Sequence, residues 1–123
     1  MNHPAKQVAV LGSTGSIGTS ALEVIEASGD RLRAIALSAH TRFRELVEQA
    51  KQHRPKWVVA TDQQAAGEFD WSKLPKETEL LIGANALNDV VAESEVDVVL
   101  AAIVGSAGLE LSLIHISEPT RPY

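Results

Sequence analysis

The chain has 123 residues, of which 45% are hydrophobic and 22% are charged, a composition typical of one globular domain with a buried core. Its formal net charge of −5 gives no overall attraction to nucleic acid or to an anionic membrane, so any anion-binding site has to be local. The absence of cysteine excludes disulfides and thiol chemistry and is consistent with a reducing cytoplasm, where we expect this protein to be located.

The N-terminus is short and polar, and the apolar run that follows it (8–11) is too short for a signal peptide or a membrane span. This run is typical of a strand buried on both faces of a parallel sheet, expected over residues 7–11. It leads into the glycine loop Gly12-Ser13-Thr14-Gly15-Ser16-Ile17-Gly18, and a helical pattern covers 17–27. This order is typical of a phosphate-binding turn, in which the glycines permit a tight turn, approach of a pyrophosphate, and close helix packing.

Strands and helices alternate along the rest of the chain. Further strands are expected at 33–38, 57–60, 79–82 and 96–104, and helices at 42–53, from Thr61 or Asp62 to about 66, and at 86–93. This alternation predicts an α/β fold with a doubly wound parallel sheet, that is, a Rossmann-like domain. Ligands of such sheets bind at the carboxyl ends of the strands, where the strand order reverses. The glycine loop and the end of the last strand, near 104–105, should therefore line one crevice.

The pattern changes after residue 111. Residues 112–123 contain two prolines and no helical period, although a helix should follow the last strand. The stretch resembles a translated adapter or vector read-through rather than a native domain ending. We therefore predict a cofactor domain over 1–111 that is incomplete at its C-terminus, and a non-native tail over 112–123.

The end of the second strand favours NADP over NAD. An NAD site usually has an acid about 20 residues after the glycines, at the end of the second strand, to bind the ribose 2′-hydroxyl, but here no acid stands between the start of that strand and Glu45. Arg42, together with Thr41 and His40, offers charge and hydrogen bonds to a 2′-phosphate instead. The alternative is that Arg42 is simply a solvated residue in the first turn of the next helix.

No catalytic or metal-binding residue is predicted. The loop lacks the lysine of a nucleoside-triphosphate-binding P-loop, and its serines have no identifiable histidine and acid partners. The four histidines lack ligand spacing, and no acidic cluster follows a strand.

Two motifs together resemble one enzyme family. LGSTGSIGTS at 11–20 and AAIVGSAGL at 101–109 are similar to the N-terminal domain of 1-deoxy-D-xylulose 5-phosphate reductoisomerases. The resemblance implies a parent enzyme that makes 2-C-methyl-D-erythritol 4-phosphate with NADPH and Mg²⁺ or Mn²⁺, as a homodimer, in non-mevalonate isoprenoid synthesis. It implies that residues 101–105 lie near the nicotinamide. The expected cofactor-binding residues are Gly12, Thr14, Gly15, Ser16, Ile17 and Arg42, of which the 14–17 segment would hold the pyrophosphate.

The sequence also departs from this family. Many members have Gly-Lys-Asn where this chain has His40-Thr41-Arg42, so that the cation stands one residue later. The family's Asn-Lys-Glu segment, metal ligands and substrate-phosphate residues would lie beyond residue 111, so we expect this polypeptide alone to be inactive. Two alternatives are the cofactor domain of another NADP-dependent reductase, of the semialdehyde dehydrogenase type, and a nucleotide-binding module without catalysis.

Overall fold

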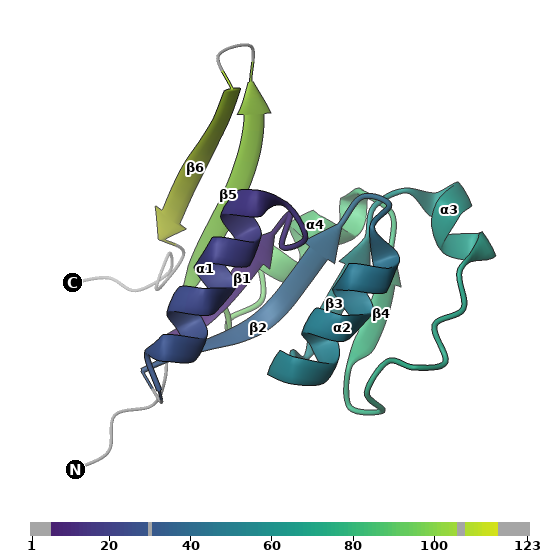
Figure 1. Cartoon of the computed structure of the whole chain (residues 1–123), viewed down its shortest axis with the longest axis horizontal. Coiled ribbons are helices and arrows are strands. Elements are labelled where there is room, and N and C mark those ends of the chain that lie inside the picture. Colours follow the sequence, from purple (N-terminus) through teal and green to yellow (C-terminus); the bar gives the residue numbers. More distant parts are fainter. Residues whose placement is uncertain (1–5, 30, 106–107, 116–123) are drawn as a thin grey trace.

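The computed structural model describes residues 6–29, 31–105 and 108–115, with 101–105 and 108–115 as backbone (Figure 1). Strands and helices alternate through most of this part of the chain. In order they are β1 (Lys6–Leu11), α1 (Ser16–Ala27), β2 (Leu32–Ala39), α2 (Phe43–His53), β3 (Trp57–Ala60), α3 (Gln63–Glu68), β4 (Glu79–Ile82), α4 (Asn85–Val91), β5 (Val98–Gly105) and β6 (Gly108–His115).

The strands form a single sheet in the order β4-β3-β2-β1-β5-β6. The first five are parallel, and helices lie on both faces of the sheet, with α1 and α2 on one face and α4 on the other (Figure 1). This confirms the predicted Rossmann-like α/β fold. The strand order reverses at β1, which has β2 on one side and β5 on the other, so the end of β1 lies at the switch point where such sheets bind ligands.

The last strand was not expected. We predicted no regular element after residue 111, but β6 continues to His115 and pairs antiparallel with β5, from Gly105 opposite Gly108 to Val98 opposite His115. The sequence carries a signal for it, since leucines at 109, 111 and 113 alternate with polar residues at 110 and 112. This period-2 pattern predicts a strand, and the short Ser106-Ala107 connection, outside the described residues, favours a hairpin over a crossover.

The helices that flank the glycine loop bury one face each. On α1, Gly18, Leu22 and Ile25 are buried, whereas Val24 is 62% exposed although it is apolar. On α2, the buried residues Phe43, Leu46, Val47 and Ala50 recur at helical spacing and form one face.

The core is divided by the sheet. Leu22, Leu46 and Val10 belong to the cluster under α1 and α2, whereas Val59 and Val90 belong to the one under α4. An irregularity in β2 allows this strand to contribute side chains to both core clusters. Because Val8 pairs with Ala34 and Ala9 with Ala36, residue 35 is an extra one, and Ala34 and Leu37 come to lie on the same face.

The loop after α3 closes the end of the first cluster with aromatic side chains. Phe43, Phe69 and Trp71 lie with ring centroids 4.7–5.6 Å apart, and the Trp71 indole N–H donates to the carbonyl of Ala66 at 2.9 Å. Asp62 begins α3, as expected, because its carboxylate accepts a hydrogen bond from the Ala65 N–H at 3.1 Å. Trp71 therefore packs against the first cluster.

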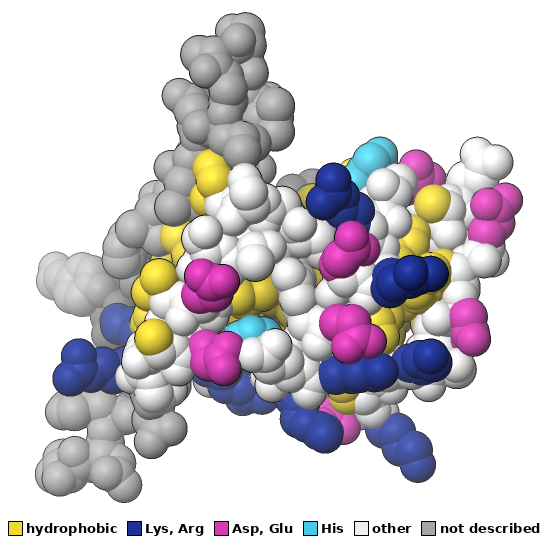
Figure 2. Space-filling view, in the orientation of Figure 1, with side chains coloured by type: hydrophobic (Ala, Val, Ile, Leu, Met, Phe, Trp, Pro, Cys, Tyr) yellow, Lys and Arg dark blue, Asp and Glu magenta, His cyan; other side chains and the backbone are white. Residues whose placement is uncertain are grey.

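Charges are mixed on the face formed by α1 and α2. Acidic and basic side chains lie among one another on this face, and Lys and Arg side chains gather along its lower edge in the view (Figure 2). Within the described ranges, no helix combines the length and the apolar character that crossing a membrane requires.

His53, near the end of α2, gives the fold a pH dependence. Burial lowers its pKa from the ordinary value of 6.5, partly opposed by the Glu26 carboxylate. Below pH 6.5 the unfolded chain therefore binds more protons at this position than the folded one, so stability falls as the pH falls. We expect a small loss of unfolding free energy between pH 7.5 and pH 5.5 in urea titrations, and a smaller loss in His53→Gln. Equal losses in the two proteins would contradict this role.

Candidate functional site

The glycine loop between β1 and α1 is a turn held by its own backbone. Gly12 has a φ of +75°, a conformation that favours glycine, and its carbonyl accepts a hydrogen bond from the Gly15 N–H at 3.1 Å. Gly18 lies against this turn: a Cβ on it would stand 2.3 Å from the Gly12 oxygen and 2.6 Å from the Cα of Ser13. The roles predicted for the first and third glycines, a tight turn and close packing, therefore agree with this geometry.

The second glycine has no such requirement within the chain. A Cβ on Gly15 would meet only the Gly12 oxygen, at an ordinary 3.5 Å, and its φ of −76° is open to any residue. Gly15 is the N-cap of α1 but offers no side chain to its N–H groups. A glycine here keeps the backbone accessible at the start of the helix.

Four N–H groups of this loop are unpaired within the described residues. The amides of Thr14, Ser16, Ile17 and Gly18 donate to no described group, whereas the Thr19 N–H donates to the Gly15 carbonyl at 2.8 Å and continues the helix. Open N–H groups and the positive end of a twelve-residue helix suit an anion such as a phosphate. The structure thus brings Gly12, Thr14, Gly15, Ser16 and Ile17 together around one turn.

The turn rests on β2 and α2. The Gly12 N–H donates to the hydroxyl of Ser38 at 2.9 Å, and the Ser13 N–H to the carbonyl of the same residue, also at 2.9 Å. Ser13 is fully buried, and its side chain and carbonyl both contact Gln49. We had not singled out Ser38 or Gln49. The signals were a serine at the end of an apolar strand, and a glutamine three residues after Leu46, beside the buried stripe of α2.

The end of β2 carries the other predicted site residue. Arg42 is exposed, is the N-cap of α2, and makes no ion pair or side-chain hydrogen bond with the described residues. His40 is also exposed and lies close to the end of β3, with its Nδ1 3.1 Å from the Thr61 hydroxyl and its Nε2 3.7 Å from the Asp62 carboxylate. The fold thus places Asp62 near His40. The search for an acid at the end of the second strand did not find it, because Asp62 follows the third strand in the sequence.

The resemblance to the enzyme family places residues 101–105 near a nicotinamide. In the structure they belong to β5, which lies beside β1 on the side opposite β2. Ala101 pairs with Leu11, the last residue of β1, and β5 continues beyond it to Gly105. Strand register therefore brings this segment next to the loop. The side chains of 101–105, like all of Ser106 and Ala107, lie outside the described residues.

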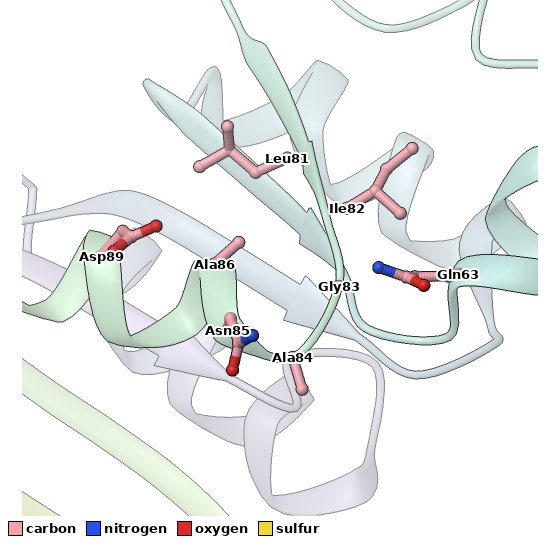
Figure 3. Close-up of a pocket in the computed structure, with 8 residues that line it drawn as sticks. All are labelled: Gln63, Leu81, Ile82, Gly83, Ala84, Asn85, Ala86 and Asp89. Carbon is pink, nitrogen blue, oxygen red and sulfur yellow. The ribbon is translucent and has the colours of Figure 1, made fainter.

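A depression lies at the same edge of the sheet, at the end of β4. It has a volume of about 440 Å³ and is lined by Gln63, residues 81–86 and Asp89 (Figure 3). Asp89 is its one charged lining residue, so the depression lacks a cation for a phosphate. Two strands, β3 and β2, lie between β4 and β1, and the depression is therefore distinct from the glycine loop.

Comparison with known proteins identifies the family. The family model described as 1-deoxy-D-xylulose 5-phosphate reductoisomerase matches residues 8–121. The chain belongs to the 1-deoxy-D-xylulose 5-phosphate reductoisomerase family. This finding favours the reductoisomerase over a semialdehyde dehydrogenase as the parent, as the two motifs predicted.

Individual reductoisomerases are similar to this chain in sequence and in structure. The enzyme of Proteus mirabilis (strain HI4320) is 40% identical over 118 residues, which are 94% of this chain and 30% of that protein. The solved structure of the reductoisomerase from Zymomonas mobilis in complex with NADPH is 36% identical, with a TM-score of 0.73 over 85% of this chain and 27% of that one. A reductoisomerase structure with NADPH, fosmidomycin and magnesium is 33% identical, with a TM-score of 0.70 over 84% of this chain and 26% of that one.

The matches also define which part of the reductoisomerase this chain corresponds to. It spans about 30% of the length of the curated relatives it matches. Among the residues that the structure describes, no group of three or more histidine, aspartate or glutamate side chains is placed to hold a metal ion.

Proposed function

We propose that this chain is the NADPH-binding, N-terminal part of a 1-deoxy-D-xylulose 5-phosphate reductoisomerase. The observation that carries the proposal is the glycine loop: it lies at the switch point of a Rossmann-like sheet and presents, at the start of α1, N–H groups that donate to none of the described residues. In this proposal, Gly12, Thr14, Gly15, Ser16 and Ile17 hold the pyrophosphate. NADPH, when bound, supplies the hydride for a reduction.

Each part of this loop has a task in binding. The conformation of Gly12 turns the chain, the amides of Thr14, Ser16 and Ile17 donate hydrogen bonds to phosphate oxygens, and the absence of a side chain at Gly15 lets the phosphate approach. Arg42, at the start of α2, binds the 2′-phosphate that distinguishes NADPH from NADH. Its exposed guanidinium, with no ion pair to the described residues, supports this role.

The complete reaction is proposed for the whole parent enzyme. There the NADPH-bound domain would serve the conversion of 1-deoxy-D-xylulose 5-phosphate to 2-C-methyl-D-erythritol 4-phosphate, in cytoplasmic isoprenoid synthesis by the non-mevalonate route and in a homodimer. The divalent metal and the sugar phosphate would be bound by residues outside this chain's described part. We also propose that the native domain sequence ends near residue 111 and that 112–123 is a foreign tail, which sequencing of the source gene past codon 111 tests.

The 123-residue protein is expected to bind NADPH without catalysing the reaction. Calorimetric titration with NADPH and with NADH should give a clearly lower Kd for NADPH. Addition of 1-deoxy-D-xylulose 5-phosphate and Mn²⁺ or Mg²⁺ should cause no loss of NADPH absorbance at 340 nm, a wavelength at which NADPH but not NADP⁺ absorbs. Failure to bind NADPH would overturn the proposed site, and turnover would show that this chain contains its own substrate and metal groups.

A further inference from the structure

One hydrogen-bonded pair joins the glycine loop to α2. The Gln49 amide nitrogen donates to the carbonyl of Ser13 at 2.8 Å, and its amide oxygen accepts from the Ser13 hydroxyl at 2.7 Å. The two residues are 36 positions apart in the sequence, and Ser13 is fully buried. A reciprocal pair of this kind fixes both the side chain and the backbone of Ser13.

The carbonyl of Ser13 belongs to the peptide unit whose N–H is that of Thr14. The described residues contain no cis peptide bond, and in a trans peptide the C=O and N–H point in opposite directions. Gln49 holds the Ser13 oxygen toward α2, with the Thr19 hydroxyl as a second, longer donor at 3.4 Å. The Thr14 N–H consequently points away from Gln49, and it donates to no described group.

This peptide is also the central one of the turn that Gly12 and Gly15 close with their 3.1 Å hydrogen bond. The central peptide is the unit whose orientation distinguishes the common turn types, so its direction requires support from outside the turn. Gln49 provides that support from α2, the same helix that begins next to Arg42.

We infer that Gln49 is a positioning residue for the cofactor: it orients the Ser13–Thr14 peptide so that the Thr14 N–H is presented to the pyrophosphate. The inference rests on the proposed function and adds to it a residue that touches no ligand atom. It also connects the two halves of the site, because one helix carries both the 2′-phosphate ligand Arg42 and the support for the pyrophosphate loop. Loss of Gln49 should therefore weaken binding of a ligand with a pyrophosphate more than binding of one without it.

The test uses the full 123-residue chain and two probes, NADPH and adenosine 2′-monophosphate, which has the 2′-phosphate but no pyrophosphate. Gln49→Glu keeps the acceptor for the Ser13 hydroxyl but cannot donate to the Ser13 carbonyl, and Gln49→Met keeps the shape without either hydrogen bond. We expect the Kd for NADPH to rise about tenfold in both variants, the loss of about one hydrogen bond of 1.4 kcal/mol, while the Kd for the monophosphate stays within about twofold.

Matched variants separate this role from a general loss of structure. Gln52→Met changes an exposed glutamine of the same helix and should leave both Kd values unchanged. Ser13→Ala removes the hydroxyl but keeps the Gln49 hydrogen bond to the carbonyl, so it should weaken NADPH binding less than Gln49→Met does.

The outcomes are distinguishable. Equal weakening of the two probes in the Gln49 variants, or unchanged NADPH binding, would overturn the inference while the proposed function stands. An equal effect of Ser13→Ala and Gln49→Met on NADPH binding would overturn it too. The hydrogen bond from Gln49 to the Ser13 carbonyl would then contribute nothing beyond the one from the Ser13 hydroxyl. Absence of NADPH binding by the unmodified chain would overturn the proposed function itself.

Discussion

Gly18→Ala is expected to destabilise the domain by about 3 kcal/mol and to abolish NADPH binding. In an ordinary helix this substitution is favourable by about 1 kcal/mol. Here the added methyl carbon would stand 2.3 Å from the Gly12 oxygen and 2.6 Å from the Ser13 Cα, both backbone atoms that no rotamer change can move away. The helix and the turn would have to separate, and overpacking of this kind costs 1–3 kcal/mol or more. Thermal unfolding should show a Tm lower by roughly 10–20 °C.

Gly15→Ala is the matched control for this prediction. Its methyl group would make only an ordinary 3.5 Å contact, so stability should stay within about 1 kcal/mol of the unmodified protein. The same methyl group would stand where we place the pyrophosphate, so NADPH binding should weaken about tenfold or more. A Gly15→Ala protein that binds NADPH normally would show that the phosphate does not approach this residue. A Gly18→Ala protein of unchanged Tm would contradict the packing role of Gly18.

Arg42→Gln is expected to weaken NADPH binding by roughly 10- to 100-fold and to leave NADH binding within about twofold. The expected loss corresponds to one charge-assisted hydrogen bond to the 2′-phosphate, worth about 1.5–3 kcal/mol. NADH lacks this phosphate and so gains nothing from the guanidinium. The measurement is calorimetric titration of both nucleotides at one salt concentration, because exposed charges are screened by salt.

Arg44→Gln controls for the change in net charge. Arg44 is exposed and lies on α2, two residues after Arg42, so its replacement should change neither affinity by more than about twofold. A similar loss for NADPH and NADH in Arg42→Gln would contradict recognition of the 2′-phosphate. It would instead support the alternative in which Arg42 is a solvated residue at the start of its helix.

The acid near His40 bears on the same selectivity. Asp62 lies 3.7 Å from the His40 ring and would repel a 2′-phosphate if its charge faced the ligand. Its carboxylate also accepts the N-cap hydrogen bond of α3, and 33% of the side chain is exposed. Arg42, which makes no ion pair with the described residues, is therefore the cation that we propose for the 2′-phosphate.

The sequence by itself determined the order of strands and helices, the parallel sheet and the glycine loop. Each depends on residues that are neighbours in the chain: apolar runs for buried strands, the i, i+3, i+4 spacing of Phe43, Leu46 and Val47 for α2, and Asp62 before α3. The position of the glycine loop at the switch point followed as well, because a βαβ alternation leaves few topologies open. Even β6 has a readable signal, in its alternating leucines.

Only the tertiary structure decided what holds the loop in place. Gln49 meets Ser13 across 36 residues, and His40 meets Thr61 across 21. Such pairs depend on how each helix is rotated on the sheet and where each strand ends in space, and neither is encoded by local spacing. The irregularity in β2 is of the same kind, since the pairing with β1 creates it. The chain's pattern thus specifies that a glycine turn joins β1 to α1, whereas the contacts that hold this turn against α2 depend on how the helix packs on the sheet.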